Sequence, residues 1–177
     1  MKLLPIFAAV LVLSAPLLAV GDAAPALVNP SGSGLKVVRM SERTDEEVSF
    51  EGQIWVSGTL HAQWLVIAGK PLDSTAILKA TLELDQSEMD RLPHFSDDKA
   101  NEVWVENPKE AVQIAFDKNS AARFLGKKTR YAELHGRFLL KGLTIGECGS
   151  PWASATLVTA SDQQKATFTQ GWEFGDC

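Results

Sequence analysis

The three histidines are the residues of this sequence best suited to metal binding or proton transfer. His61 and His135 fall on the polar faces of two strand-like segments, where Glu133 or Glu147 could join them around a metal ion. Scattered residues without a fixed ligand spacing are, however, typical of solvent-facing side chains. We therefore predict no metal site and no cofactor.

Compact catalytic motifs are missing from the sequence. It has no G-x-S-x-G elbow, no H-E-x-x-H motif, no P-loop and no G-x-G-x-x-G after a strand. Cys148 could act as a nucleophile with His135 or His61 as its base, but a reactive thiolate needs an electropositive setting. No catalytic residue is therefore predicted, and a small hydrolase or metal-dependent enzyme stays as an alternative.

Five tryptophans are many for 177 residues. Trp64 has the phase of the expected core, whereas Trp55, Trp104 and Trp152 do not. Exposed tryptophans would suit stacking on a sugar ring, an aromatic ligand or a protein partner. The alternative is that neighbouring loops and the C-terminal arm bury them. Together with His61, these three tryptophans are the candidate binding residues.

The N-terminal residues predict export. A basic Lys2, an apolar run and then small residues are typical of a signal peptide, which we place at residues 1–21; a membrane anchor is the alternative. A flexible leader at 22–46, in which residues 35–40 could add a short strand, and one domain at 47–177 with a C-terminal arm follow. Behind a signal peptide, Cys148 and Cys177 are expected to form a disulfide that closes about thirty residues.

Charge restricts the partners. Lys2 is the only charged residue in residues 1–21, so removing them changes the formal net charge from −5 to −6. An acidic chain disfavours nucleic-acid phosphates and anionic membrane surfaces, so we expect neither nucleic-acid binding nor a stable membrane anchor. A protein or a small-molecule ligand stays open, and oligomeric state is not predicted.

Two long strands with matching glycines must position the candidate residues. Residues 47–69 alternate apolar and polar side chains without a change of parity, which predicts one long strand that bends at Gly52 and Gly58. Residues 131–144 repeat the alternation with Gly136 and Gly142 again six residues apart. Paired bends of this kind suit a small closed barrel.

Shorter elements lie between and after these strands. We expect strands at 74–84, 102–106, 110–116, 152–160 and 165–174. A short helix is predicted at 117–125, with Asn119 or Ser120 as N-cap and Gly126 as C-cap.

Over residues 47–160 this order of elements resembles small secreted bacterial OB-fold proteins of uncharacterised function. The resemblance implies a mainly β, five-stranded Greek-key barrel with one short helix between strands 3 and 4. It also implies a binding surface on strands 2 and 3 and on the loops joining strands 1 to 2 and 4 to 5, but no particular activity. A β-sandwich or a lipocalin-like barrel is the alternative.

These observations favour a secreted or periplasmic, non-enzymatic binding or interaction module with an unknown ligand. An inhibitor or immunity protein for a partner enzyme, and the enzyme considered above, remain alternatives.

Overall fold

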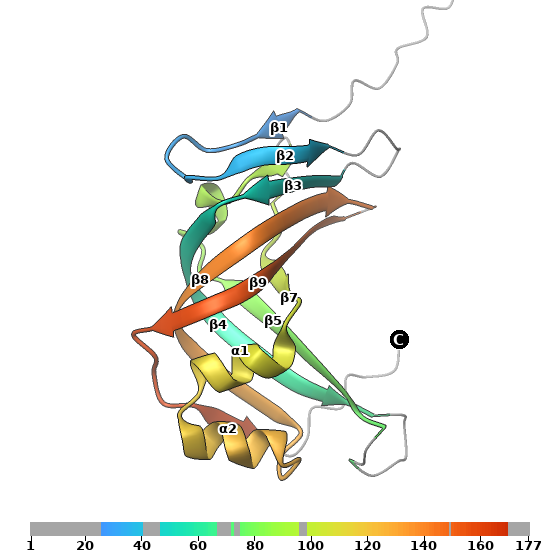
Figure 1. Cartoon of the computed structure of the whole chain (residues 1–177), viewed down its shortest axis with the longest axis vertical. Coiled ribbons are helices and arrows are strands. Elements are labelled where there is room, and N and C mark those ends of the chain that lie inside the picture. The colour runs from blue at the N-terminus through green and yellow to red at the C-terminus, as the bar shows by residue number, and fades with distance from the viewer. Residues whose placement is uncertain are drawn as a thin grey trace, which may run out of the picture.

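The computed structural model describes residues 26–40, 47–66, 72, 75–95, 99–148 and 150–169 (Figure 1). In chain order the elements are β1 (Leu27–Val28), β2 (Lys36–Met40), β3 (Glu47–Glu51), β4 (Gln53–Leu65), β5 (Ile77–Leu84), a 3-10 turn (Met89–Arg91), β6 (His94–Phe95), β7 (Glu102–Val105), α1 (Pro108–Ala115), α2 (Lys118–Leu125), β8 (Tyr131–Glu147), β9 (Pro151–Ser161) and β10 (Thr167–Thr169). No helix in this described part is long and apolar enough to cross a membrane.

Five strands close into a barrel. β4 pairs with β5, β5 with β7, β7 with β9, β9 with β8, and β8 returns to β4 (Figure 1). The β7–β9 pair is parallel and the other four are antiparallel. The predicted mainly β, five-stranded barrel is thus confirmed. Two short helices, rather than the single predicted helix, connect the third barrel strand to the fourth.

The two long strands supply the centre of the core. Their inward residues follow the predicted alternation, so that Val56 lies opposite Phe138 and Ile54 opposite Leu140, all four buried. The chain bends between β3 and β4 at Gly52, whose φ of 120° is a backbone conformation that favours glycine. Burial of these apolar faces against one another is the main term that stabilises the barrel.

The segment 110–116 was predicted as a strand, and that prediction is wrong: residues 110–115 belong to α1 and Phe116 is its C-cap. Pro108 begins the helix, where its missing N–H costs nothing, and the buried Ala111, Val112 and Ala115 follow helical spacing. The side chain of Asn107 bonds to the backbone of β9: its Nδ2 donates to the Leu157 carbonyl and its Oδ1 accepts from the Leu157 N–H, each at 2.9 Å. This pairing ends β7 and directs the chain into the helix.

The helix predicted at 117–125 is confirmed as α2, with Gly126 as its C-cap. Its N-cap is Asp117 rather than Asn119 or Ser120, because the Asp117 carboxylate accepts both of their backbone N–H groups at 3.0 Å. A hydrogen bond from the Ser120 side chain, together with these backbone bonds, holds the pKa of Asp117 below its ordinary value.

The N-terminal region adds strands outside the barrel. β1 pairs with β6, and β2 pairs with β3, which itself pairs with the end of β8. Part of the segment 22–46, predicted as a flexible leader, is therefore paired strand. Residues 1–21, predicted as a signal peptide, lie outside the described residues.

Candidate binding face

Trp104 and Trp152 come together on the outside of the barrel. Trp104 points outward from β7 and is 47% exposed. Its ring stacks on that of Trp152 at the start of β9, with centroids 6.2 Å apart and planes 18° from parallel. A side chain at Gly146 would clash with this second ring, since an added Cβ would lie 2.3 Å from a Trp152 ring carbon. The glycine on β8 thus makes room for the aromatic pair.

The tryptophan pair lines one of two neighbouring surface hollows. One, of about 520 Å³, is lined by Asn101, Glu102, Trp104, Cys148, Ser150, Pro151 and Trp152. The other, of about 530 Å³, is lined by His61, Gln63, Leu65, Lys79, Thr81, Glu83, Glu102 and Tyr131. Glu102 lines both, so the hollows are neighbours on the outer surface of β4, β5, β7 and β9. We call the surface formed by these lining residues the Trp104 face.

Strand pairing explains why residues so far apart in sequence meet here. Thr81 of β5 lies opposite His61 of β4 on one side and opposite Trp104 of β7 on the other. Trp104 in turn lies opposite Ser154 of β9. Side chains in such a row point to the same side of the sheet, so the outward positions of four strands form one continuous surface.

Polar contacts hold the Trp104 side chain on both flanks. Its indole N–H donates to Oε1 of Glu102 at 3.2 Å. The Lys79 ammonium lies 5.5 Å from the centroid of the Trp104 ring, within the range of a cation–π interaction. The exposed ring is therefore placed between a second indole and a cation.

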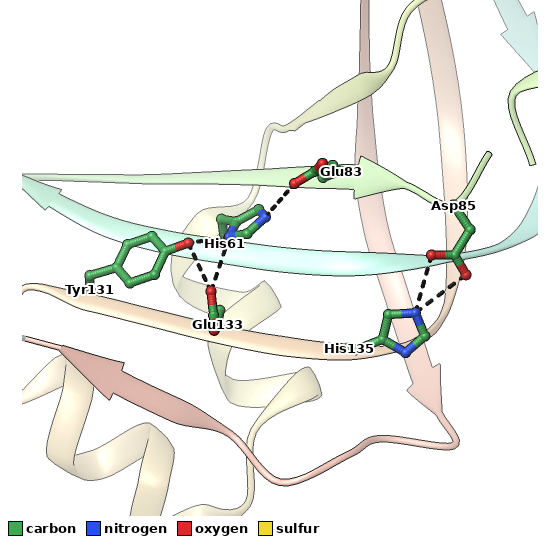
Figure 2. Close-up of polar contacts among 6 residues, drawn as sticks. All are labelled: His61, Glu83, Asp85, Tyr131, Glu133 and His135. Atoms are coloured by element: carbon green, nitrogen blue, oxygen red, sulfur yellow. Dashed lines mark hydrogen bonds and ion pairs between the residues drawn. The ribbon is translucent and has the colours of Figure 1, made fainter. Parts of the chain in front are cut away.

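His61 lies at the other end of the face, within a cluster of polar side chains (Figure 2). Its Nε2 is 3.0 Å from Oε2 of Glu83, and its Nδ1 contacts the Tyr131 hydroxyl and lies 3.9 Å from Glu133. The Tyr131 hydroxyl donates to Oε2 of Glu133 at 3.2 Å. Three strands, β4, β5 and β8, thus fix the orientation of the imidazole.

The electrostatics of this cluster keep Tyr131 protonated. Burial raises the pKa of the Tyr131 hydroxyl to about 12, and the negative charges of Glu133 and Glu83 add to the shift. The Tyr131 hydroxyl therefore keeps its proton, and can donate to Glu133, up to a higher pH than an exposed tyrosine.

The two strand histidines serve different partners. Nε2 of His135 lies 3.2 Å and 3.3 Å from the two Asp85 carboxylate oxygens, and Figure 2 shows this pair apart from the His61 cluster. Among the residues that the structure describes, no group of three or more histidine, cysteine, aspartate or glutamate side chains could hold a metal ion. The hypothetical convergence of His61 and His135 on one ion does not occur.

The predicted binding residues thus fall into two places. Trp104, Trp152 and His61 line the Trp104 face, whereas Trp55 lines neither hollow. Trp55 is half-buried on β4 opposite Leu139, with the Arg137 guanidinium 5.6 Å from its ring centroid.

Several residues of the face were not among the predicted ones. Lys79 and Glu83 share the outward phase of β5, and Glu102 that of β7, but these phases identify a common surface only once the strand pairing is known. Cys148 is exposed and lines one hollow. Cys177 lies outside the described residues, so the disulfide stays a prediction.

The fold and this face define a β-barrel with an aromatic outer surface. Comparisons with protein-family models, curated proteins and solved structures gave no match to this chain.

Proposed function

We propose that this protein is a secreted or periplasmic, non-enzymatic binding module whose ligand contacts the Trp104 face. One observation carries the proposal: two stacked indoles, one of them half exposed, line a surface hollow that has a second hollow as its neighbour. Exposed aromatic pairs of this kind supply large contact areas with little loss of side-chain freedom on binding.

The position of the face supports an OB-fold assignment and this use of it. Counted along the chain, β5 and β7 are the second and third barrel strands, and the β8–β9 loop joins the fourth strand to the fifth. These are the elements that form the binding surface in the general OB-fold. Cys148 and Ser150 of that loop line the hollow beside the tryptophans.

A capture experiment with matched tryptophan variants tests the proposal. The purified protein, Trp104→Ala and Trp55→Ala would each be immobilised and exposed to an extract of the cells that produce the protein. We expect a ligand to be enriched by the wild type and by Trp55→Ala but not by Trp104→Ala. The reason is that, of the two substituted tryptophans, only Trp104 belongs to the Trp104 face. Equal capture by all three proteins would contradict the proposal.

The same experiment separates the alternatives. An inhibitor or immunity protein would capture an enzyme and abolish that enzyme's activity on binding. A catalytic protein would instead convert its ligand, and His61→Ala, which removes the only histidine lining the described hollows, would stop the turnover.

A further inference from the structure

The charges of the Trp104 face favour a cationic occupant. Glu83 and Glu102 line the hollows, and the Glu133 carboxylate lies 3.9 Å from Nδ1 of His61. Glu106, which accepts a hydrogen bond from Ser154 at 2.8 Å, adds a fourth exposed or half-exposed carboxylate on the neighbouring part of β7 and β9. Among the residues lining the two hollows, Lys79 is the only lysine or arginine.

Lys79 also shows where a cation is accommodated. Its ammonium is seated on the Trp104 ring, and the outward carboxylate of Glu83 is on the same strand, two outward positions away. The electron-rich ring and the nearby carboxylates stabilise positive charge at this point. The lysine side chain is long and exposed, so it can leave the ring to another cation at little cost.

We infer that the occupant of the Trp104 face is an extended, arginine-bearing peptide segment of a partner protein, with one guanidinium taking the place of the Lys79 ammonium on Trp104. This inference rests on the proposed function and specifies its ligand. A guanidinium suits the position better than an ammonium, because its plane stacks on an indole while its N–H groups reach a carboxylate such as Glu102.

The extent of the face favours a chain segment over a single small amine. The hollows extend across β4, β5, β7 and β9, which at the usual strand spacing is about 14 Å. An extended segment of about four residues covers that length. Its basic side chains would meet the carboxylates of Glu83 on β5 and Glu102 on β7.

Fluorescence anisotropy with labelled peptides tests the inference on the purified full chain. The probes are a Gly-Ser peptide with two arginines, the same peptide with both arginines replaced by lysine, and a neutral control peptide with both replaced by citrulline. We expect the arginine peptide to bind best and the citrulline peptide to bind at least about tenfold more weakly. Added salt should weaken binding of the two charged peptides and leave that of the citrulline peptide unchanged. Trp104→Ala and Glu102→Gln should each weaken binding of the arginine peptide about tenfold.

Two lysine variants provide the sharpest comparison. Lys79→Met keeps the apolar stem but removes the competing ammonium, so it should bind the arginine peptide several-fold more tightly. Lys141→Met makes the same charge change on the exposed part of β8 outside both hollows and should leave the affinity unchanged. An equal gain in affinity for the arginine peptide in both variants would indicate a general charge effect. It would contradict the inference that a guanidinium of the peptide stacks on Trp104.

The outcomes distinguish this inference from the proposed function. If the citrulline peptide binds as well as the arginine peptide and both need Trp104, the face binds but its ligand is not cationic. If no peptide binds while cell-extract capture still needs Trp104, the inference again fails alone. If the arginine peptide binds regardless of Trp104, it binds elsewhere, and the inference fails.

Discussion

Tyr131 is the only tyrosine of the chain, so its ionisation can be measured directly. Burial raises its pKa to about 12, with contributions from the negative charges of Glu133 and Glu83. The tyrosinate absorbance of the folded protein should therefore appear about two pH units above the ordinary value of about 10, which the urea-unfolded chain should show. An ultraviolet pH titration in both states checks this.

A variant separates the causes of the shift. Glu133→Gln removes one carboxylate charge with little change in shape, so the pKa of Tyr131 should fall. It should stay above about 10, because burial is the largest cause and remains. Titrating the variant alongside the wild type measures the charge contribution.

The sign of the stability change follows from the direction of the shift. A raised pKa means that the folded state favours the protonated hydroxyl, so this contribution to stability is fully present below about pH 10 and is lost between about pH 10 and pH 12. Tyr131→Phe lacks the group, and its stability should fall less steeply over that window. A folded-state pKa near 10, or identical pH profiles for the two proteins, would refute the described surroundings of Tyr131.

The remaining predictions concern the core and the cysteines. Phe138 is fully buried, so Phe138→Asp should prevent soluble accumulation, whereas Arg137→Asp on the exposed side of the same strand should be tolerated; similar yields would mean that the inward and outward phases of β8 are misassigned. Protein isolated from its native compartment should carry a Cys148–Cys177 disulfide. Its intact mass should then show no alkylation before reduction and two alkylated cysteines after it. Alkylation without reduction would contradict the disulfide.

Strong local patterns made the barrel predictable. The alternation along β4 and β8 identified their buried faces, because both strands bury one face over many residues and a period of two is then imposed on the sequence. The segment 110–116 was wrongly predicted as a strand because the alternation of Val112, Ile114 and Phe116 covers too few residues to distinguish a strand from a helix. Pro108, which occupies the first position of α1, was the local signal for a helix at this point of the chain.

The Trp104 face was only partly predictable, because it depends on how distant strands pair. Trp104 and Trp152 could be singled out as large apolar side chains off the core phase, but their stacking depends on the parallel pairing of β7 with β9. Nothing local encodes that pairing, since α1, α2 and β8 lie between these two strands in the chain. The contact of Lys79 with Trp104 likewise depends on the register of β5 with β7.

The most direct test of the binding face is fluorine NMR of protein labelled with fluorotryptophan, titrated with the captured ligand. Each of the five tryptophans gives its own signal, and single Trp→Phe variants assign them. Ligand should shift the signals of Trp104 and Trp152 and leave that of Trp64, whose indole donates to the Phe124 carbonyl on α2. Binding that leaves Trp104 and Trp152 unshifted, or that shifts Trp55 alone, would contradict the account.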